Sequence, residues 1–177
     1  MRMTEQAQGL RAHISRHVGR AFYPACKSDI EEPLSLIAPL VDEVVFCDPN
    51  DALAPAFSRW RSATKPRVTW LRKGAVEALE ELGEFDVLFY RRDSDGEGGS
   101  RVFVLGDVFM RKLLPLFHNG RGLIITDGSN ERGGLFRKMR RPSGLIRHGY
   151  SFSPIIEPTI EAAGLTPIAV QRLPGAV

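Results

Sequence analysis

The chain has 177 residues, a formal net charge of +3, and 43% apolar and 25% charged residues. These values are ordinary for one globular domain that buries a core without disulfides or metal. No apolar run approaches the roughly 18 residues that a membrane span needs, and the N-terminal residues lack the apolar core of a secretory signal. We therefore expect a cytoplasmic protein.

Cys26 and Cys47 are the two cysteines of the chain, one just after a predicted strand and one at the end of the next. Cytosolic proteins normally keep their thiols reduced, which favours two buried thiols over a redox pair. The sequence has no CxxC motif, and its histidines do not have zinc-like spacing with the cysteines. We predict no metal site of the thiolate kind.

Residues 1–19 predict a helical arm with a narrow apolar face, and residues 20–177 predict one domain in which strands and helices alternate. In chain order the apolar patterns predict a strand at Ala21–Pro24, a helix at Ile30–Leu40, a strand at Glu43–Cys47, a helix at Ala54–Arg61, a strand at Arg67–Leu71, a helix at Ala75–Leu82 and a strand at Phe85–Arg91.

The second half continues this alternation. Residues 101–117 are ambiguous between a helix, which Ser100 would cap, and a short strand; the helix is favoured. The rest of the pattern predicts a strand at Gly122–Thr126, helices at Leu135–Arg140 and Pro154–Ala163, and a strand at Thr166–Gln171. This order indicates an α/β, Rossmann-like three-layer sandwich: a mainly parallel sheet of about six strands with helices on both faces.

The segment 20–50 forms one predicted strand–helix–strand unit. A polar turn at residues 25–29 leaves its first strand, and Asp29 is placed to cap the following helix. Asp48 ends the second strand about twenty positions beyond the turn, the spacing at which α/β sheets place an acid for nucleotide-like ligands. A carboxylate there can accept both hydroxyls of a ribose. The alternative is that Asp48 begins an Asp-Pro-Asn turn.

Polar clusters follow several predicted strands, at residues 25–29, 48–50, 92–100 and 127–130. In open α/β sheets the ligand crevice lies at this carboxyl edge, which favours a pocket over ordinary polar loops. The candidate cofactor-binding residues are Tyr23, Pro24, Ala25, Asp29, Asp48, Asn50 and Asp127.

The order of elements, the Asp at the end of the second strand and the ending EAAGLTPIAVQRL resemble class I, Rossmann-like S-adenosylmethionine-dependent methyltransferases. Within that group the chain resembles small uncharacterised bacterial proteins with a YPxxxxD-type first turn and an ITDGSN-like strand. The resemblance implies S-adenosylmethionine as the cofactor, with its methionine part against the first turn.

The chain departs from the family pattern at three places. Its first turn, residues 23–29, has no glycine, whereas the family uses a glycine-rich turn that lets the backbone approach the cofactor. Arg72 and Lys73 follow the third strand, where the family often has an acid that contacts adenine. The D/N-P-P-Y/F motif of amino-methylating members is absent after the fourth strand.

Two further clusters carry candidate chemistry. Asp93 and Glu97, in an acidic glycine-rich loop, could act as the catalytic general base; a solvated loop is the alternative. The segment 132–148 has clustered Lys and Arg and no acid, and it could contact phosphates through Arg137, Lys138, Arg140 and Arg141. A solvated helix face is the alternative there.

Two hypotheses follow from the sequence. The first is a methyltransferase-like protein that binds S-adenosylmethionine or a related small nucleoside, acts on an unknown substrate, and is either an enzyme or without catalytic activity. The second is a non-catalytic Rossmann-like module that contacts nucleic acid or a protein partner through the basic 132–148 segment.

Overall fold

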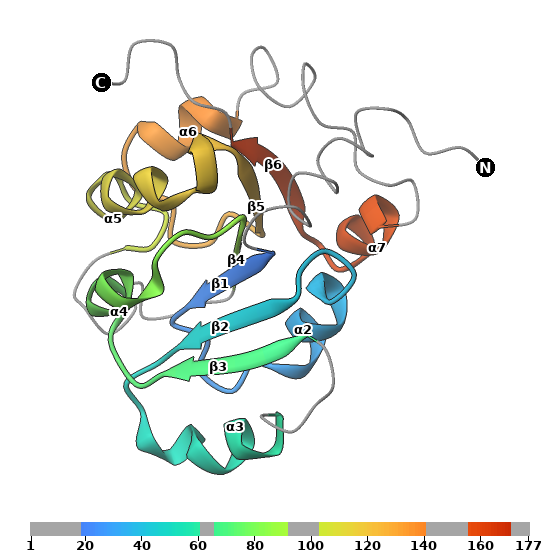
Figure 1. The fold of residues 1–177 in the computed structure, drawn as a ribbon. Helices are drawn as coiled ribbons and strands as arrows, with labels where there is room; N and C mark the ends of the chain where they lie inside the picture. The colour runs from blue at the N-terminus through green and yellow to red at the C-terminus, as the bar shows by residue number, and fades with distance from the viewer. Residues whose placement is uncertain (1–18, 61–65, 92–102, 141–155, 171–177) are drawn as a thin grey trace.

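The computed structural model describes residues 19–60, 66–91, 103–140 and 156–170 (Figure 1). Three parts of the sequence predictions lie outside these residues: positions 1–18 of the N-terminal arm, the acidic loop with Asp93 and Glu97, and Arg141. The side chain of Arg140 lies outside them as well.

The described residues form a six-stranded sheet of order β3-β2-β1-β4-β5-β6. Its strands are β1 (Arg20–Pro24), β2 (Glu43–Cys47), β3 (Arg67–Leu71), β4 (Val87–Tyr90), β5 (Gly122–Thr126) and β6 (Thr166–Val170). Neighbouring strands are parallel, except that β6 runs antiparallel to β5. The predicted mainly parallel, Rossmann-like sheet is therefore confirmed, and its strand order reverses between β1 and β4.

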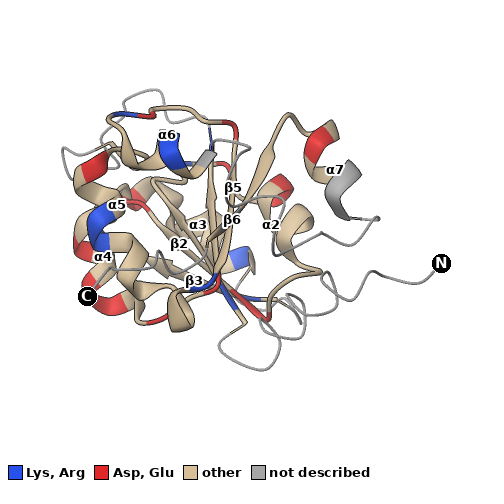
Figure 2. Ribbon diagram, turned by 90° about the horizontal axis from the view of Figure 1, so that it is seen from above, with Lys and Arg blue, Asp and Glu red and all other residues tan. Residues whose placement is uncertain are grey.

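Helices cover both faces of this sheet and complete three layers (Figures 1 and 2). The helices are α2 (Glu31–Ile37), α3 (Ala54–Trp60), α4 (Ala75–Leu82), α5 (Asp107–Leu113), α6 (Leu135–Arg140) and α7 (Ile156–Ala162). α2, α3 and α7 lie on one face, and α4, α5 and α6 lie on the other. Within the described residues no helix is both long and apolar enough to span a bilayer.

Aromatic side chains fill the core between the sheet and its α2–α3 face. Tyr23 of β1 packs between Phe46 of β2 and Phe89 of β4, with ring centroids 5.9 and 5.0 Å away. Phe57 of α3 stacks on Trp70 of β3 at 4.9 Å. Burying one such ring stabilises the fold by about 2 to 3 kcal/mol. The core therefore continues to the carboxyl ends of β1, β2 and β4.

Two sequence predictions about helix starts are wrong. α5 begins at Asp107, not after Ser100, because the extended Gly106 forms a β-bridge with Arg132 instead of entering a helix. Asp29 does not cap α2: the helix begins after Ile30 without a side-chain cap, and the Asp29 carboxylate is bound by Arg91 instead. In both cases a residue distant in sequence makes the contact that the local pattern assigns to the helix: Arg132 pairs with Gly106, and Arg91 binds Asp29.

Candidate functional site

The candidate site lies at the carboxyl edge of the sheet, where β1, β2 and β4 end. The turn after β1 and the end of β2 are tied together by two hydrogen bonds: Lys27 N donates to Asp48 Oδ2 (3.1 Å), and Cys26 N donates to the Cys47 carbonyl (3.2 Å). The first turn and Asp48 therefore share one rim of the sheet, next to the point where strand order reverses. This is the position at which open α/β sheets bind their ligands.

Asp48 is 7% exposed, and each of its carboxylate oxygens accepts one backbone N–H. The second bond comes from Asn50 N (2.9 Å), and the Asn50 side chain in turn accepts Ala52 N at the start of the following 3-10 helix. The Asp-Pro-Asn turn weighed as an alternative is therefore present. A carboxylate has about four lone-pair sites, so two acceptor sites remain on Asp48.

The backbone of the first turn takes the left-handed conformation at two non-glycine residues. Ala25 has φ 54° and Lys27 has φ 51°, values that favour glycine. Each such residue costs roughly 1 to 2 kcal/mol. The turn has the shape that glycine would adopt most easily, but here it carries side chains.

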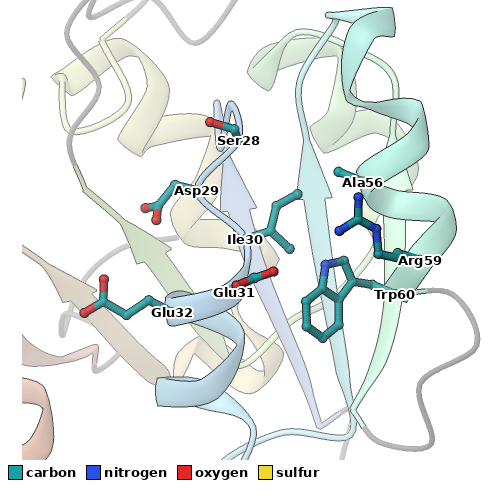
Figure 3. A pocket seen from close by; sticks show the side chains of 8 residues that line it. All are labelled: Ser28, Asp29, Ile30, Glu31, Glu32, Ala56, Arg59 and Trp60. Atoms are coloured by element: carbon teal, nitrogen blue, oxygen red, sulfur yellow. The ribbon is translucent and has the colours of Figure 1, made fainter.

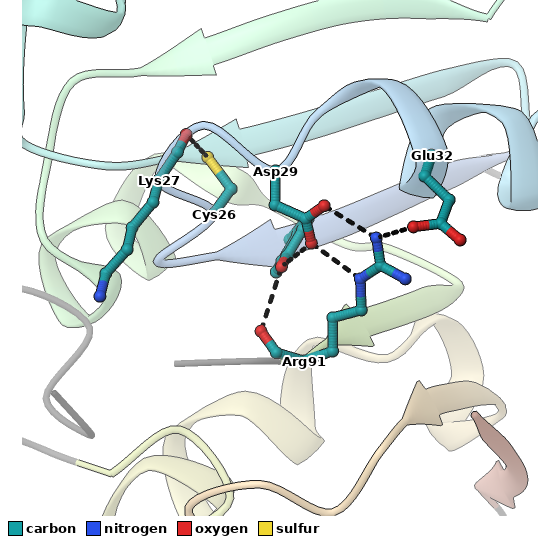
Figure 4. Close-up of polar contacts among 6 residues, drawn as sticks. Cys26, Lys27, Asp29, Glu32 and Arg91 are labelled. Carbon is teal, nitrogen blue, oxygen red and sulfur yellow. Dashed lines mark hydrogen bonds and ion pairs between the residues drawn. The ribbon is translucent and has the colours of Figure 1, made fainter. Parts of the chain in front are cut away.

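Arg91, the first residue after β4, extends its side chain toward Asp29 and Glu32, which follow β1 (Figure 4). Its Nε and Nη2 donate to the two carboxylate oxygens of Asp29, both at 2.8 Å, and Nη2 also contacts Glu32 Oε2 at 2.6 Å. The Arg91 side chain is 1% exposed. This two-pronged pair joins the end of β4 to the start of α2.

Tyr23 completes this cluster from below. Its hydroxyl donates to Asp29 Oδ2 (2.8 Å) and lies 3.2 Å from the Arg91 carbonyl oxygen. Burial, together with the negative charge of Asp29, raises the pKa of Tyr23, so the phenol stays protonated. The hydrogen bonds to Asp29 raise the pKa of Arg91. One charged, hydrogen-bonded network therefore joins Tyr23, Asp29, Glu32 and Arg91. We call it the Arg91 cluster.

One polar atom of the cluster has no partner among the described residues. Arg91 Nη1 is buried and makes no hydrogen bond there. A buried donor without an acceptor costs about 1 to 3 kcal/mol. Sequence reasoning missed Arg91, and the available signal was an Arg that directly follows a strand at the sheet edge opposite the Asp of the first turn.

The other predicted site residues divide between the two sides of the edge. Pro24, at the end of β1, and Ala25, in the first turn, are buried, while Asn50 is exposed beside Asp48. Asp127 is exposed after β5, where its Oδ1 accepts Ser129 N (2.9 Å), and β4 lies between β5 and β1. The structure brings Tyr23, Asp29 and Asp48 to the β1 turn and leaves Asp127 at a more distant strand end.

The basic residues behave differently from one another. Arg137 pairs with Glu131 (3.0 Å), whereas Lys138 is exposed on the same helix.

Both thiols are buried and free; burial raises the pKa of Cys47 to about 12 and also raises the pKa of Cys26. Within the described part of the chain no group of three or more His, Cys, Asp or Glu side chains is arranged to hold a metal.

A shallow groove of about 300 Å³ lies beside the cluster, between α2 and α3 (Figure 3). Its lining residues are Ser28, Asp29, Ile30, Glu31, Glu32, Ala56, Arg59 and Trp60. The volume is at the lower end for a small-molecule site, and Asp48 is not part of the lining. The groove therefore shares Asp29 and Glu32 with the Arg91 cluster but does not reach Asp48.

No protein-family model and no curated protein sequence matches the chain. Similar solved structures include TrmN from Thermus thermophilus (17% identity, TM-score 0.49, covering 94% of this chain and 48% of TrmN). An rRNA methylase from Streptococcus thermophilus is 11% identical (TM-score 0.48, covering 98% and 99%). The N-methyltransferase NodS from Bradyrhizobium japonicum is 13% identical (TM-score 0.45, covering 94% of each chain). The chain spans about half the length of TrmN, and likenesses with TM-scores below 0.5 carry no argument about function.

The site can be tested for its fit to S-adenosylmethionine, the cofactor that the sequence resemblance implies. For the sugar half, Asp48 retains acceptor sites beside the first turn, but it is 7% exposed and is not part of the groove lining. The methionine half does not fit: Ala25 and Lys27 carry a Cβ where glycine would allow close approach, and Arg91 and Asp29 fill the adjoining space. The complete cofactor therefore does not fit the described conformation.

Proposed function

We propose that this chain is a methyltransferase-like Rossmann domain that binds a nucleoside-type ligand beside Asp48 and does not transfer methyl groups. The observation that carries this proposal is the Arg91–Asp29 pair, which fills the switch point between β1 and β4, while Asp48 at the neighbouring strand end keeps acceptor sites. The ligand class is a ribonucleoside without a methionyl tail.

The argument for the sugar rests on Asp48. Its carboxylate is held by backbone N–H groups of Lys27 and Asn50, which fix its orientation without using all its lone pairs. A ribose diol needs two acceptors at one fixed place, and a carboxylate supplies them. Pro49 and Asn50 are exposed, so the cover over Asp48 on that side is only a surface turn.

The argument against the tail rests on the Arg91 cluster. An amino-acid tail against the first turn would have to displace Arg91 from Asp29 and Glu32. Breaking this two-pronged ion pair is costly, because the Arg91 guanidinium is buried and would lose its partners. A tail would form new contacts only with Asp29, Glu32 and their neighbours. Replacing the Arg91 contacts by these contacts is therefore unfavourable.

Titration calorimetry with adenosine, S-adenosylhomocysteine and S-adenosylmethionine tests the proposal. We expect adenosine to bind at least as tightly as either tailed ligand. S-adenosylmethionine binding a hundredfold more tightly than adenosine would refute the filled-tail argument. The absence of heat with adenosine, in folded protein at millimolar ligand, would remove the nucleoside site.

Two variants sharpen the titration. Asp48→Asn replaces one acceptor oxygen with a donor, so we expect adenosine affinity to fall at least tenfold. Asp42→Asn is the matched control, because Asp42 is an exposed acid just before β2, at the opposite edge of the sheet. Equal affinities in the two variants would contradict a ribose contact at Asp48.

A further inference from the structure

The surface around the start of α5 combines exposed apolar and basic side chains. Phe103 is 36% exposed and Val108 is 62% exposed, and they are the large apolar residues left exposed in the described part of the chain. Arg111, Arg132 and Lys138 are exposed around them. We call these five residues the α5–α6 patch; Figure 2 shows basic positions on both helices.

Backbone hydrogen bonds connect both the Phe103 loop and the Arg132 loop to the start of α5. Gly106 N donates to the Phe103 carbonyl (2.9 Å), and Asp107 N donates to the Arg132 carbonyl (3.2 Å). The Arg132 guanidinium lies over the Phe103 ring, 4.7 Å from its centroid. Residues from two separate loops therefore build one cation–aromatic platform in front of α5.

Arg111 lies on α5 and Lys138 on α6, the helices that follow Phe103 and Arg132 in the chain. The carboxylate of Asp107 accepts Leu135 N (2.8 Å) and Gly134 N (3.2 Å), which lower its pKa, and the charges of Arg111 and Lys138 lower it further. Both cations therefore lie near Asp107. Among the described residues no ion pair within 4.0 Å joins either cation to that carboxylate, so both can face an external anion.

The patch lies at the same edge of the sheet as the candidate site. α5 and α6 both begin at the carboxyl edge, after β4 and β5 respectively. Asn130 Nδ2, in the loop before Arg132, donates to the hydroxyl of Tyr90 at the end of β4 (2.9 Å). Arg91, the next residue, belongs to the cluster on the other face.

We propose that the α5–α6 patch binds single-stranded nucleic acid. A base stacks on the Phe103–Arg132 platform, and Arg111 and Lys138 contact the phosphates on either side. An exposed ring with an Arg plane suits an unpaired base, and separated cations follow a strand. Charge complementarity alone would also suit an acidic peptide, but the planar Phe103–Arg132 platform favours a flat base, which every nucleotide supplies. This inference is independent of the proposed nucleoside site.

Fluorescence anisotropy of the full chain with a labelled twelve-nucleotide oligo(U) tests the proposal, at 50 and 200 mM salt. Phe103→Ala should weaken binding by about five- to a hundredfold, the effect of losing one stacked base. Arg111→Ala with Lys138→Ala should lower the magnitude of the slope of log affinity against log salt by about 1.4, for two phosphate contacts. Arg121→Ala is the control, because Arg121 is an exposed cation just before β5, at the opposite edge of the sheet.

Several outcomes would overturn the proposal. One is no binding at 50 mM salt with folded protein. Another is binding that is unchanged in Phe103→Ala and lost only when the cations are removed. Equal affinity for a blunt duplex, or for poly-glutamate, would likewise assign the patch to a different partner. If Phe103→Ala does not fold, Arg132→Ala removes the other half of the platform at an exposed position and should weaken binding in the same way.

Discussion

The ends of β2 and β4 each present one charged residue to the same edge of the sheet, and they are held in opposite ways. Asp48 is fixed by backbone N–H groups of the turns around it. Arg91 is fixed by the carboxylates of Asp29 and Glu32. A backbone-held acceptor can share its remaining lone pairs with a ligand, whereas a side-chain ion pair must break before a ligand enters. The two strand ends therefore differ in what they can admit.

The largest effect should come from removing the Arg91 side chain. Arg91→Ala removes a buried side chain and leaves the partly exposed Asp29 and Glu32 without their partner, so we expect the free energy of unfolding to fall by about 3 kcal/mol. Urea unfolding measures this loss. Arg72→Ala is the control, because Arg72 pairs with Asp51 on the exposed surface and should cost less than about 1 kcal/mol. Similar losses of unfolding free energy in the two variants would show that the Arg91 cluster stabilises the fold no more than a surface ion pair does.

The β2 end should be less sensitive. Asp48→Asn keeps one acceptor oxygen but turns a donor toward a backbone N–H, so we expect a loss of about 1 to 3 kcal/mol. The same urea experiment, run on Asp48→Asn and on Arg91→Ala, ranks the two strand ends. If Asp48→Asn lowers the free energy of unfolding more than Arg91→Ala does, Asp48 contributes more than Arg91 to the stability of this edge of the sheet.

The opposite end of β2 provides a pH-dependent reference. Burial raises the pKa of Glu43, but hydrogen bonds from Arg20, Thr69 and Arg67 outweigh it and hold that pKa below its ordinary value. Its contribution to stability is therefore present above the unfolded pKa and is lost as pH falls through the folded pKa. Glu43→Gln should cost about 1 kcal/mol at pH 7 and nothing at pH 2. An equal cost at both pH values would show that ionisation of Glu43 plays no part.

The smallest change should come from the first turn. Lys27→Gly relieves a left-handed residue but adds chain entropy to the unfolded state, so stability should change by less than about 1 kcal/mol, toward gain. Ser35→Gly, in the middle of α2, is the matched control and should destabilise by about 0.5 to 1 kcal/mol. Thermal unfolding distinguishes the two, and a loss in both would mean that the turn is not strained at Lys27.

Much of the fold could be predicted from the sequence because apolar runs such as Val44–Cys47 and Gly122–Thr126 are fully buried in the sheet. The first turn and Asp48 were also predicted to lie together, since parallel strands end at one edge. Asp29 was misassigned as a helix cap because local pattern cannot reveal Arg91, which follows it by 62 positions. Pairing between distant charges depends on the assembled sheet.

The most direct test of the account is an NMR titration with adenosine and then with S-adenosylmethionine. The backbone amides of Lys27 and Asn50 report on Asp48, and the Nε–H of Arg91 reports on its pair with Asp29. We predict that adenosine shifts the two amide signals and leaves the Arg91 signal in place. Loss or a large shift of the Arg91 signal with S-adenosylmethionine, at an affinity above that of adenosine, would contradict the account, because the tail would then open the cluster.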